Sequence, residues 1–540
     1  MTQQAALRAD STRQAAPQRE GVLPADAVPF KTWVAVCGAC LGAFLAILNI
    51  QIVSSSLADI QGAIGAGIDD GGWITTSYLV AEIIVIPISG WLARVFSLRY
   101  YLLTNIALFL IFTVGCAFTS NLGEMIVVRA LQGFSGGVLI PLAFSIIMTR
   151  LPPSKHPTGL AIYSVSAVFA PAIGPVIGGY CNENFGWQAV FMVNVLPGLL
   201  MFGLLWFSLD SDPPQLKLLR QGDWSGILFM AVGLGCLETF LEEGEKDDWF
   251  GSTFITRLAI ISTVSLLAFL VLQLVKKNHL LEIRLLLRRN FSLATIANFV
   301  FGFSMFGWIF VVPLYLARLQ GYNAQQIGGV LIWIGLPQLA ILPFIPKLMK
   351  YVDSRRIVGA GFTLFIGGSL LALNFSDDFS GPQFIWSSVV RALGQSLVMA
   401  PLSAIAIAGI EREYAPSASA LFNMIRNLGG AIGIAALQTF LTIREQYHSD
   451  IITSQVSLLN SETRRRLAIL QDRFMTHGVT DTALAHHEAV VAIGRIVRRQ
   501  ASMLAYSDTI IFQSVLLGIG LLSVLGLKKA APATSGRQGR

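Results

Sequence analysis

The sequence predicts an all-α integral membrane protein, because three of its properties agree. Of its 540 residues, 54% are hydrophobic and 13% are charged, against roughly 25% charged residues in a soluble domain. Apolar runs of about twenty residues, the length that crosses a bilayer, follow one another along the chain. Lys and Arg gather in alternate connections, as they do in the cytoplasmic loops of membrane proteins. This distribution also explains the net charge of +7, which in a soluble protein would suggest nucleic acid binding.

The apolar runs predict about fourteen transmembrane helices. Because this count is even, both chain ends are expected on the cytoplasmic side, which the basic connections also indicate. Residues 1–32 are polar and lack the apolar core of a signal peptide, so they are predicted to form a cytoplasmic tail, as are residues 529–540. The predicted spans lie near residues 33–54, 72–93, 100–119, 124–148, 158–180, 187–208, 225–242, 253–275, 293–317, 327–349, 356–375, 382–410, 417–440 and 508–528.

One segment of the chain repeats. Residues 127–131 (Val-Val-Arg-Ala-Leu) recur unchanged as residues 389–393, and a Pro-Leu pair follows each copy. Internal repeats of this kind are typical of transporters built from related halves. We therefore expect a six-helix half within 33–208 and a second half made of 291–440 and 508–528, with two extra helices and a cytoplasmic loop in 209–290. Segment 441–507 is too long for a hairpin and too polar to span, so it is predicted to be a long periplasmic loop with two helices of its own.

Two short patterns stand in the predicted fourth and fifth helices. An arginine deep in a membrane helix is costly unless it faces the bundle interior. Glycines one turn apart let another backbone approach closely, and proline bends the helix that contains it. The patterns are Arg-x-x-Gln-Gly at Arg129, Gln132 and Gly133, and Gly-Pro-x-x-Gly-Gly at Gly174, Pro175, Gly178 and Gly179.

These patterns resemble signatures of the major facilitator superfamily, and the second one resembles the hinge motif of its proton-driven antiporters. Together with residues 289–291 (Arg-Asn-Phe) and 505–508 (Ala-Tyr-Ser-Asp), they make the chain similar to the fourteen-helix drug:proton antiporters of the EmrB and QacA group. Segment 441–507 makes it closer to EmrB. The resemblance implies the major facilitator fold, with two six-helix halves and two inserted helices. It also implies a multi-pass protein of the bacterial inner membrane.

The first predicted helix departs from this family where its members carry an aspartate. Asn49 occupies that position and cannot bind a proton. The best intramembrane carboxyl group is then Glu82, which shares one face of the second helix with Thr75 and Tyr78. We predict that Glu82 carries the proton and that Arg129 tunes its proton affinity, because mid-membrane carboxyl groups are functional by default. The alternative is a permanently paired structural Glu82, or the head of a cation site that never titrates.

Three other charged residues have predicted places. Arg94 stands where the family's loop signature has an aspartate, which puts the conformational salt bridge attributed to that aspartate in doubt. Glu238 is a weaker candidate for the proton carrier, because its extra helix is expected outside the central cavity. Asp508 is expected to cap the last helix.

The substrate cavity is predicted to be apolar and aromatic with few polar groups, which suits hydrophobic amphipathic ligands. Aromatic side chains are dense in residues 299–310, and at least half of these are expected to face lipid. Arg391 and Arg426 suggest that anionic or weakly acidic compounds are handled, unless both are paired within the bundle. The predicted polar cavity residues are Asn49, Gln51, Tyr78, Arg391, Gln395, Asn423, Arg426 and Asn427.

The resemblance implies a secondary exporter that moves hydrophobic or amphipathic drugs or toxic metabolites out in exchange for protons, with the proton gradient in place of any cofactor. It further implies the inner-membrane part of a tripartite pump, with segment 441–507 meeting a periplasmic adaptor and, through it, an outer-membrane channel. A loose cap over the outer mouth is the alternative for that segment. The alternatives for the whole chain are a proton-coupled importer, an exporter of one specific metabolite, or a membrane sensor or scaffold. No enzyme is expected, because the sequence has no phosphate-binding loop, no metal-ligand constellation and no nucleophile with a plausible base.

Overall fold

A computed structural model describes residues 28–67, 70–210, 212–220, 222–276, 281–373, 379–411 and 414–528. Residues 1–27 of the predicted N-terminal tail, and all of the predicted C-terminal tail, lie outside the described residues. In the described part of the chain the regular structure is helical throughout. The N-terminal half comprises α2 (Phe30–Ser55), α3 (Leu57–Ile64), α4 (Trp73–Phe96), α5 (Leu98–Cys116), α6 (Leu122–Gly136), α7 (Leu139–Arg150), η1 (Pro153–Lys155), α8 (His156–Phe185), α9 (Trp187–Met192) and α10 (Val195–Ser208).

Two inserted helices separate this half from the second one. The insertion comprises α11 (Lys217–Arg220), α12 (Trp224–Glu243), η2 (Trp249–Gly251), α13 (Thr253–Val275) and η3 (Ile283–Leu287). The C-terminal half comprises α14 (Arg289–Gln320), α15 (Ala324–Ile341), η4 (Leu342–Phe344), α16 (Ile345–Tyr351), α17 (Ser354–Leu370), η5 (Gly381–Gln383), α18 (Phe384–Ile407), α19 (Ala415–Gln455), α20 (Ser461–Thr476) and α21 (Thr482–Leu525).

Twelve helical segments of the described chain are long and apolar enough to cross a membrane. The bent helix α8 makes a thirteenth, with an angle of 46° between its two parts at Pro171. α17 is 17 residues long, at the short end of the range that spans a bilayer, and it packs between α18 and α21. Thirteen of the fourteen predicted spans thus match helices of the described chain that are long and apolar enough to cross a membrane, and α17 occupies the place of the remaining one.

The two halves meet along two seams. α8 packs against α15 and α18, and α19 packs against α4 and α7. The seams are tight because small residues stand at the crossings: a Cβ atom on Gly328 of α15 would lie 2.7 Å from Val176 Cα of α8. On the other side of α8, a Cβ atom on Gly178 would lie 2.8 Å from the Ile52 carbonyl oxygen, and one on Gly174 would overlap Gln51. The predicted hinge motif therefore packs α8 closely on α2.

The inserted pair is anchored at the base of α12. Asp223 caps this helix, because its Oδ1 accepts from the Gly226 N–H at 3.0 Å. The same carboxylate accepts from Lys276 Nζ at 2.6 Å and from Gln273 Nε2 at 2.7 Å, which ties the start of α12 to the end of α13. Partial burial acts to raise the pKa of Asp223, but the hydrogen bonds from Lys276, Gly226 and Gln273 outweigh it and hold the pKa below its ordinary value.

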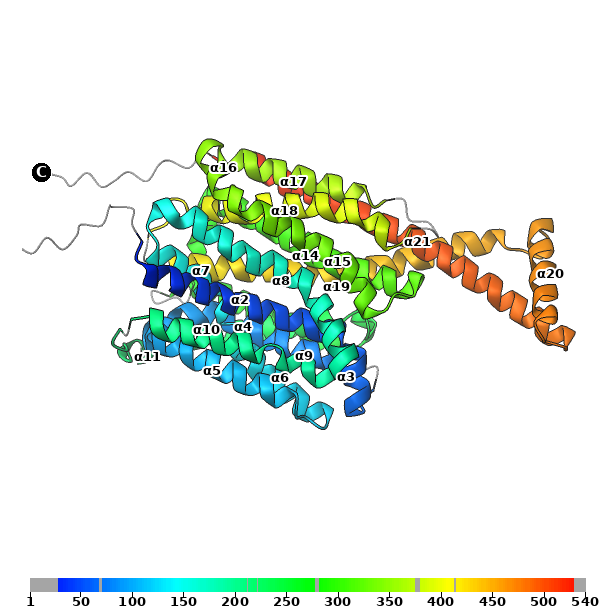
Figure 1. Ribbon diagram of the computed structural model, residues 1–540, viewed down its shortest axis with the longest axis horizontal. Helices are drawn as coiled ribbons and strands as arrows, with labels where there is room; N and C mark the ends of the chain where they lie inside the picture. Colours follow the sequence, from blue (N-terminus) through cyan, green and yellow to red (C-terminus); the bar gives the residue numbers. More distant parts are fainter. Residues whose placement is uncertain are drawn as a thin grey trace, which may run out of the picture.

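α19 and α21 run on beyond the bundle, and together with α20 they form the arm (residues 443–503) that projects from one end of the molecule (Figure 1). α20 packs against α21 near the tip of the arm. The predicted loop 441–507 is thus largely helical, and two of its helical stretches continue membrane helices. α2 begins and α21 ends at the opposite end of the bundle (Figure 1).

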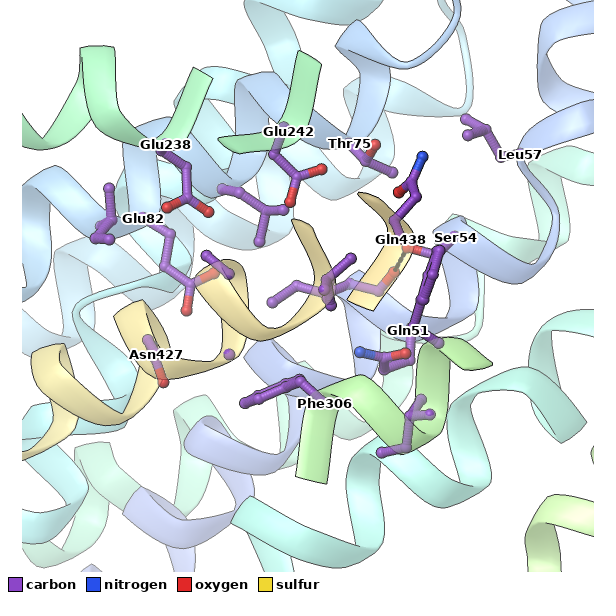
Figure 2. A pocket seen from close by; sticks show the side chains of 18 residues that line it. Gln51, Ser54, Leu57, Thr75, Glu82, Glu238, Glu242, Phe306, Asn427 and Gln438 are labelled. Carbon is purple, nitrogen blue, oxygen red and sulfur yellow. Dashed lines mark hydrogen bonds between the residues drawn. The ribbon is translucent and has the colours of Figure 1, made fainter. Parts of the chain in front are cut away.

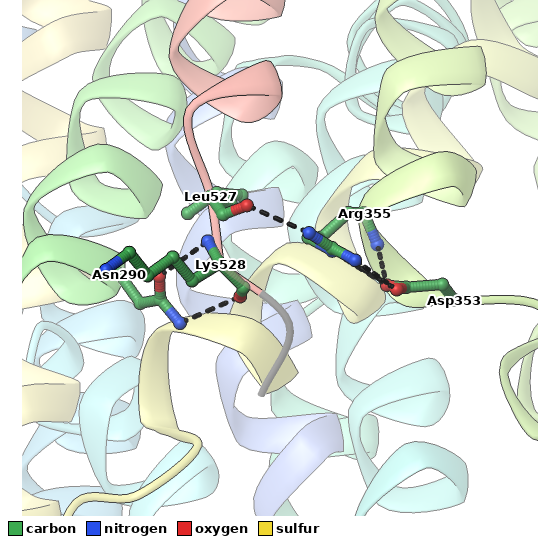
Figure 3. A network of polar contacts seen from close by, with 5 residues as sticks. All are labelled: Asn290, Asp353, Arg355, Leu527 and Lys528. Atoms are coloured by element: carbon green, nitrogen blue, oxygen red, sulfur yellow. Dashed lines mark hydrogen bonds and ion pairs between the residues drawn. The ribbon is translucent and has the colours of Figure 1, made fainter. Parts of the chain in front are cut away.

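A network of polar contacts closes the C-terminal half at that opposite end (Figure 3). Asp353 caps α17 and binds Arg355 Nη2 at 2.7 Å. Arg355 Nη1 donates to the Leu527 carbonyl at 3.0 Å. Asn290 exchanges two hydrogen bonds with the backbone of Lys528, each 3.0 Å long. The end of α21 is thereby fixed to the starts of α14 and α17.

Candidate functional site

A cavity of about 360 Å³ lies between the two halves, in the part of the bundle nearer the arm. Six helices line it, α2, α3, α4, α12, α14 and α19, and just over half of the lining residues are apolar. Its polar lining residues are Gln51, Ser54, Thr75, Glu82, Glu238, Glu242, Asn427 and Gln438 (Figure 2).

On the side away from the arm, contacts between the halves close the bundle. Tyr163 of α8 donates to Asn423 Oδ1 of α19 at 2.7 Å, and Ser419 Oγ donates to the Pro141 carbonyl at 3.3 Å. Phe144 of α7 also reaches across the halves, with 6.5 Å between its ring centroid and that of Phe422 of α19. All these side chains are buried. The structure therefore represents a state that is closed away from the arm and has its cavity on the arm side.

Glu82 faces this cavity without a fixed partner. Its side chain is 4% exposed, and no described residue donates a hydrogen bond to it or forms an ion pair with it. Close packing holds the backbone behind it, since a Cβ atom on Gly137 would lie 3.0 Å from Glu82 Cα. A buried carboxyl group with no counter-ion is costly when ionised, so this group is suited to binding a proton or a cation from the cavity.

Arg129 has partners other than Glu82. Its Nη1 donates to Asn49 Oδ1 at 2.6 Å and to Gln132 Oε1 at 2.7 Å, and its Nε donates to the Ile74 carbonyl at 3.1 Å. The guanidinium lies over the ring of Tyr78, 4.4 Å from its centroid. The residue is fully buried, and Glu82 is not among its hydrogen-bond partners.

Arg391 is the counterpart of Arg129 in the repeated segment, and it is also fully buried. It contacts Ser369 Oγ and donates to the Ser304 carbonyl at 3.2 Å. Its guanidinium carbon lies 3.8 Å from the ring centroid of Trp308. Gln395, one turn away, accepts from Gln338 Nε2 at 2.8 Å. Neither Arg391 nor Gln395 belongs to the cavity lining, and both bind within the C-terminal half.

The other predicted cavity residues divide into two groups. Gln51 and Asn427 line the cavity, and Arg426 lies directly behind it, donating to Asn427 Oδ1 at 3.2 Å. Asn49, Tyr78 and Asn423 are outside the lining. Asn49 binds Arg129, Tyr78 packs against Arg129, and Asn423 binds Tyr163 at the closed side.

Two acidic residues of α12 line the cavity, contrary to the prediction that this helix lies outside it. Glu238 is 4% exposed, and its Oε2 has no hydrogen-bond partner among the described residues. Glu242 lies one turn nearer the arm. Glu243 is held differently, because it accepts from Thr76 at 2.8 Å and from Lys246 at 2.9 Å. Sequence reasoning named Glu238 but misplaced its helix, and it missed Glu242, because hydropathy identifies a helix without its neighbours. Two glutamates one turn apart in an apolar helix were nevertheless a usable signal.

The aromatic residues of α14 are mostly interior, so the expectation that at least half face lipid is wrong. Phe301, Phe303 and Trp308 are buried, and Phe306 and Phe310 line the cavity. They give the cavity an apolar wall opposite the carboxyl groups.

Asp508 does not cap the last helix. It lies inside α21, where its Oδ2 binds Arg444 Nε at 2.6 Å and His448 Nε2 at 2.7 Å of α19. The cap is Asp481, whose side chain accepts from the Ala483 N–H. Asp508 thus joins α19 and α21 where the arm leaves the bundle.

Comparison with known proteins agrees with this architecture. The model of the Major Facilitator Superfamily matches residues 39–434. The chain is 29% identical over 490 residues to the colistin resistance protein EmrB of Acinetobacter baumannii, covering 91% of this chain and 95% of that protein. It is 31% identical over 422 residues to the multidrug export protein EmrB of Haemophilus influenzae, covering 78% and 82% of the two chains. The crystal structure of the human organic anion transporter MFSD10 aligns with a TM-score of 0.54 at 14% identity, over 91% of this chain and 100% of that one, which supports the fold alone.

Proposed function

Since this chain belongs to the major facilitator superfamily and is a drug-efflux transporter of the EmrB type rather than an enzyme, we propose that it exports amphipathic compounds in exchange for protons bound at Glu82. The observation that carries the proposal is the Glu82 carboxyl group, buried in the cavity wall with no fixed counter-ion among the described residues. Such a group is neutral when protonated and able to hold a cationic or polar ligand group when it is not. The proton gradient supplies the energy, and no cofactor takes part.

The proposed orientation puts both chain ends in the cytoplasm and the arm in the periplasm of a bacterial inner membrane. The basic residues of the connections at the end opposite the arm support it, among them Arg99 and Arg355. In this orientation the structure is an outward-facing state, with the contacts around Tyr163 closing the cytoplasmic side. Rocking of the halves along α8–α15 and α4–α19 would then present Glu82 to either side in turn.

We further propose that the arm contacts a periplasmic adaptor of a tripartite pump with an outer-membrane channel. Supporting this, the arm exposes apolar side chains far from the bundle, including Leu459, which is 92% exposed, and Ile469, which is 58% exposed. Exposed apolar groups of this kind mark interaction surfaces when they cluster. Crosslinking from these two positions in native membranes tests the contact, and a crosslink pattern without an adaptor contradicts it.

An accumulation assay tests the proton exchange. Cells that express the protein are expected to accumulate less of a fluorescent amphipathic drug than cells without it, and a protonophore is expected to remove the difference. The Glu82→Gln variant, at wild-type expression, is expected to accumulate the drug like cells without the transporter, because glutamine keeps the shape and cannot exchange a proton. Glu124→Gln is the matched control, since Glu124 is an exposed carboxylate at the start of α6. Full protonophore-sensitive efflux in Glu82→Gln refutes the assignment, and higher accumulation on expression indicates import instead.

A further inference from the structure

Glu238 belongs to the inserted helix pair, yet its helix is built into the wall of the cavity. α12 packs along α4, where a Cβ atom on Gly235 would lie 3.2 Å from Ile84 Cδ1. The loop after α12 is joined to the other half of the bundle, because Gln438 Nε2 of α19 donates to Glu245 Oε2 at 2.6 Å. α12 is therefore held between α4 and α19, and this position directs Glu238 into the cavity and away from lipid.

The carboxyl groups of Glu82 and Glu238 have the same kind of surroundings. Each side chain is 4% exposed, and Oε2 of each has no hydrogen-bond partner among the described residues. Figure 2 shows the two carboxyl groups on the same wall of the cavity. Thr239 does not donate a hydrogen bond to the Glu238 carboxyl group, because its hydroxyl donates to the Gly235 carbonyl at 2.9 Å.

The charged groups around this pair are few. On α12, Glu242 lies one turn nearer the arm and adds a third carboxyl group to the lining. Arg426 of α19 and Arg129 of α6 are buried outside the lining, and neither forms an ion pair with either carboxyl group among the described residues. The lining residues of α2 and α14 are uncharged. Within the cavity itself, a positive charge must therefore come from the ligand or from protons.

Two like charges in one apolar cavity are unfavourable together, so an empty cavity favours protons on both groups. A cation entering the cavity favours the ionised form of both groups, since each then gains an attractive partner. Resting on the proposed function, we propose that Glu238 is a second proton-exchanging carboxyl group, so that one monovalent amphipathic cation leaves the cell in exchange for two protons.

The proposed cycle returns both carboxyl groups to their starting state. With the cavity open to the cytoplasm, one cation binds and two protons leave, one from each carboxyl group, to the cytoplasm. After the halves rock, two protons from outside bind Glu82 and Glu238, and the cation is released outside. One cycle carries two positive charges in and one out, so export consumes the membrane potential as well as the pH gradient. A single exchanging carboxyl group would make the cycle electrically neutral.

The test uses the full-length protein in proteoliposomes with ethidium, a monovalent amphipathic cation, added to the bath. Transporters whose cytoplasmic side faces the bath move ethidium into the lumen and move protons from the lumen to the bath. With the same pH in the lumen and the bath, a lumen-positive potential set by potassium and valinomycin is expected to drive ethidium uptake by the wild type. The lumen-to-bath ratio of ethidium concentrations is expected to rise about tenfold for each ~59 mV of potential. Protein-free liposomes give the background, which runs in the opposite direction because the potential repels the free cation.

Variants then assign the second proton. Glu238→Gln is expected to lose potential-driven uptake and keep uptake driven by a pH gradient at zero potential. Glu238→Asp, which retains a carboxyl group, and the neighbouring control Thr239→Val are expected to keep both. If ethidium uptake by the wild type does not depend on the membrane potential, the two-proton exchange is refuted, whatever the variants show. If Glu238→Gln retains potential-driven uptake, the role of Glu238 is refuted. Wild-type uptake that ignores the pH gradient as well refutes the proposed function itself.

Discussion

The contact between Asn49 and Arg129 leaves two buried atoms unpaired, and this leads to a stability prediction. Arg129 Nη1 donates to Asn49 Oδ1 at 2.6 Å, whereas Asn49 Nδ2 and Arg129 Nη2 have no hydrogen-bond partner among the described residues. Both side chains are fully buried. Asn49→Asp replaces the unpaired amide nitrogen with an oxygen that accepts from the unpaired guanidinium nitrogen, giving a two-bond carboxylate–arginine pair.

The change in stability on Asn49→Asp is the gain from pairing the two buried atoms minus the cost of burying a carboxylate. A buried polar group without a partner costs about 1–3 kcal/mol, so pairing both atoms returns about 2–6 kcal/mol. Burying the new carboxylate costs several kcal/mol, and its attraction to Arg129 offsets much of that cost. We expect a net stabilisation of about 1–2 kcal/mol. For a folding unit the size of one half of this protein, each kcal/mol raises the melting temperature by about 2–4 °C.

Thermal unfolding of the purified protein in one detergent, at one scan rate, measures the change. Asn298→Asp is the matched control, because Asn298 is equally buried in α14 but its Nδ2 donates to the Phe422 carbonyl at 2.8 Å. There the same substitution removes a donor and sets a charge against a carbonyl oxygen, so it is expected to lower the melting temperature. If Asn49→Asp unfolds at or below the wild-type temperature, the two atoms are not unpaired in the way described, and the reasoning fails.

Two further predictions concern packing and pH. Gly178→Ala is expected to weaken the contact of α8 with α2 and to slow transport, since its Cβ atom would lie 2.8 Å from the Ile52 carbonyl oxygen. Gly203→Ala is the control, because its Cβ atom would meet no atom within 4 Å, and it is expected to leave transport unchanged. Equal transport rates for the two variants contradict this prediction. Asp223→Asn is expected to lower the unfolding free energy by about 1–3 kcal/mol at neutral pH, because it breaks the bond to Lys276. The pKa of Asp223 is depressed in the folded state, so its contribution to the free energy of unfolding is present above the unfolded pKa of about 3.9 and is lost as the pH falls through the folded pKa. The free energies of unfolding of the wild type and Asp223→Asn are therefore expected to become equal in acid. Chemical unfolding at several pH values measures this.

The helices and their grouping were predictable because each depends on local composition. A run of apolar residues forms a membrane helix whatever it later packs against. The repeated segment containing Arg129 and Arg391 likewise predicted two buried arginines, because a charge inside a membrane must face the protein interior. Both are fully buried. The partners of these arginines were not predictable, since they depend on which helices meet.

The position of the inserted pair shows the same limit. Glu238 was expected outside the cavity because α12 is additional to the two repeated halves. Its actual place depends on contacts distant in sequence, such as the close approach of Gly235 to Ile84 and the bond between Glu245 and Gln438. Hydropathy contains no information on such contacts. Asp508 was misplaced for a related reason: the polar residues before it suggested a helix start, but on the arm they are exposed to water and continue α21 back to Thr482.

The arm continues α19 and α21 without a break, and both helices belong to the C-terminal half. The part of α21 outside the bundle is about 30 Å long at 1.5 Å per residue. A stiff rod of that length magnifies any tilt of its base, so a rotation of the C-terminal half by about 10° carries the tip roughly 5 Å sideways. The contacts of Asp508 with Arg444 and His448 join α19 and α21 at the base of the arm. If the C-terminal half rotates in the proposed transport cycle, α20 is therefore displaced with each cycle.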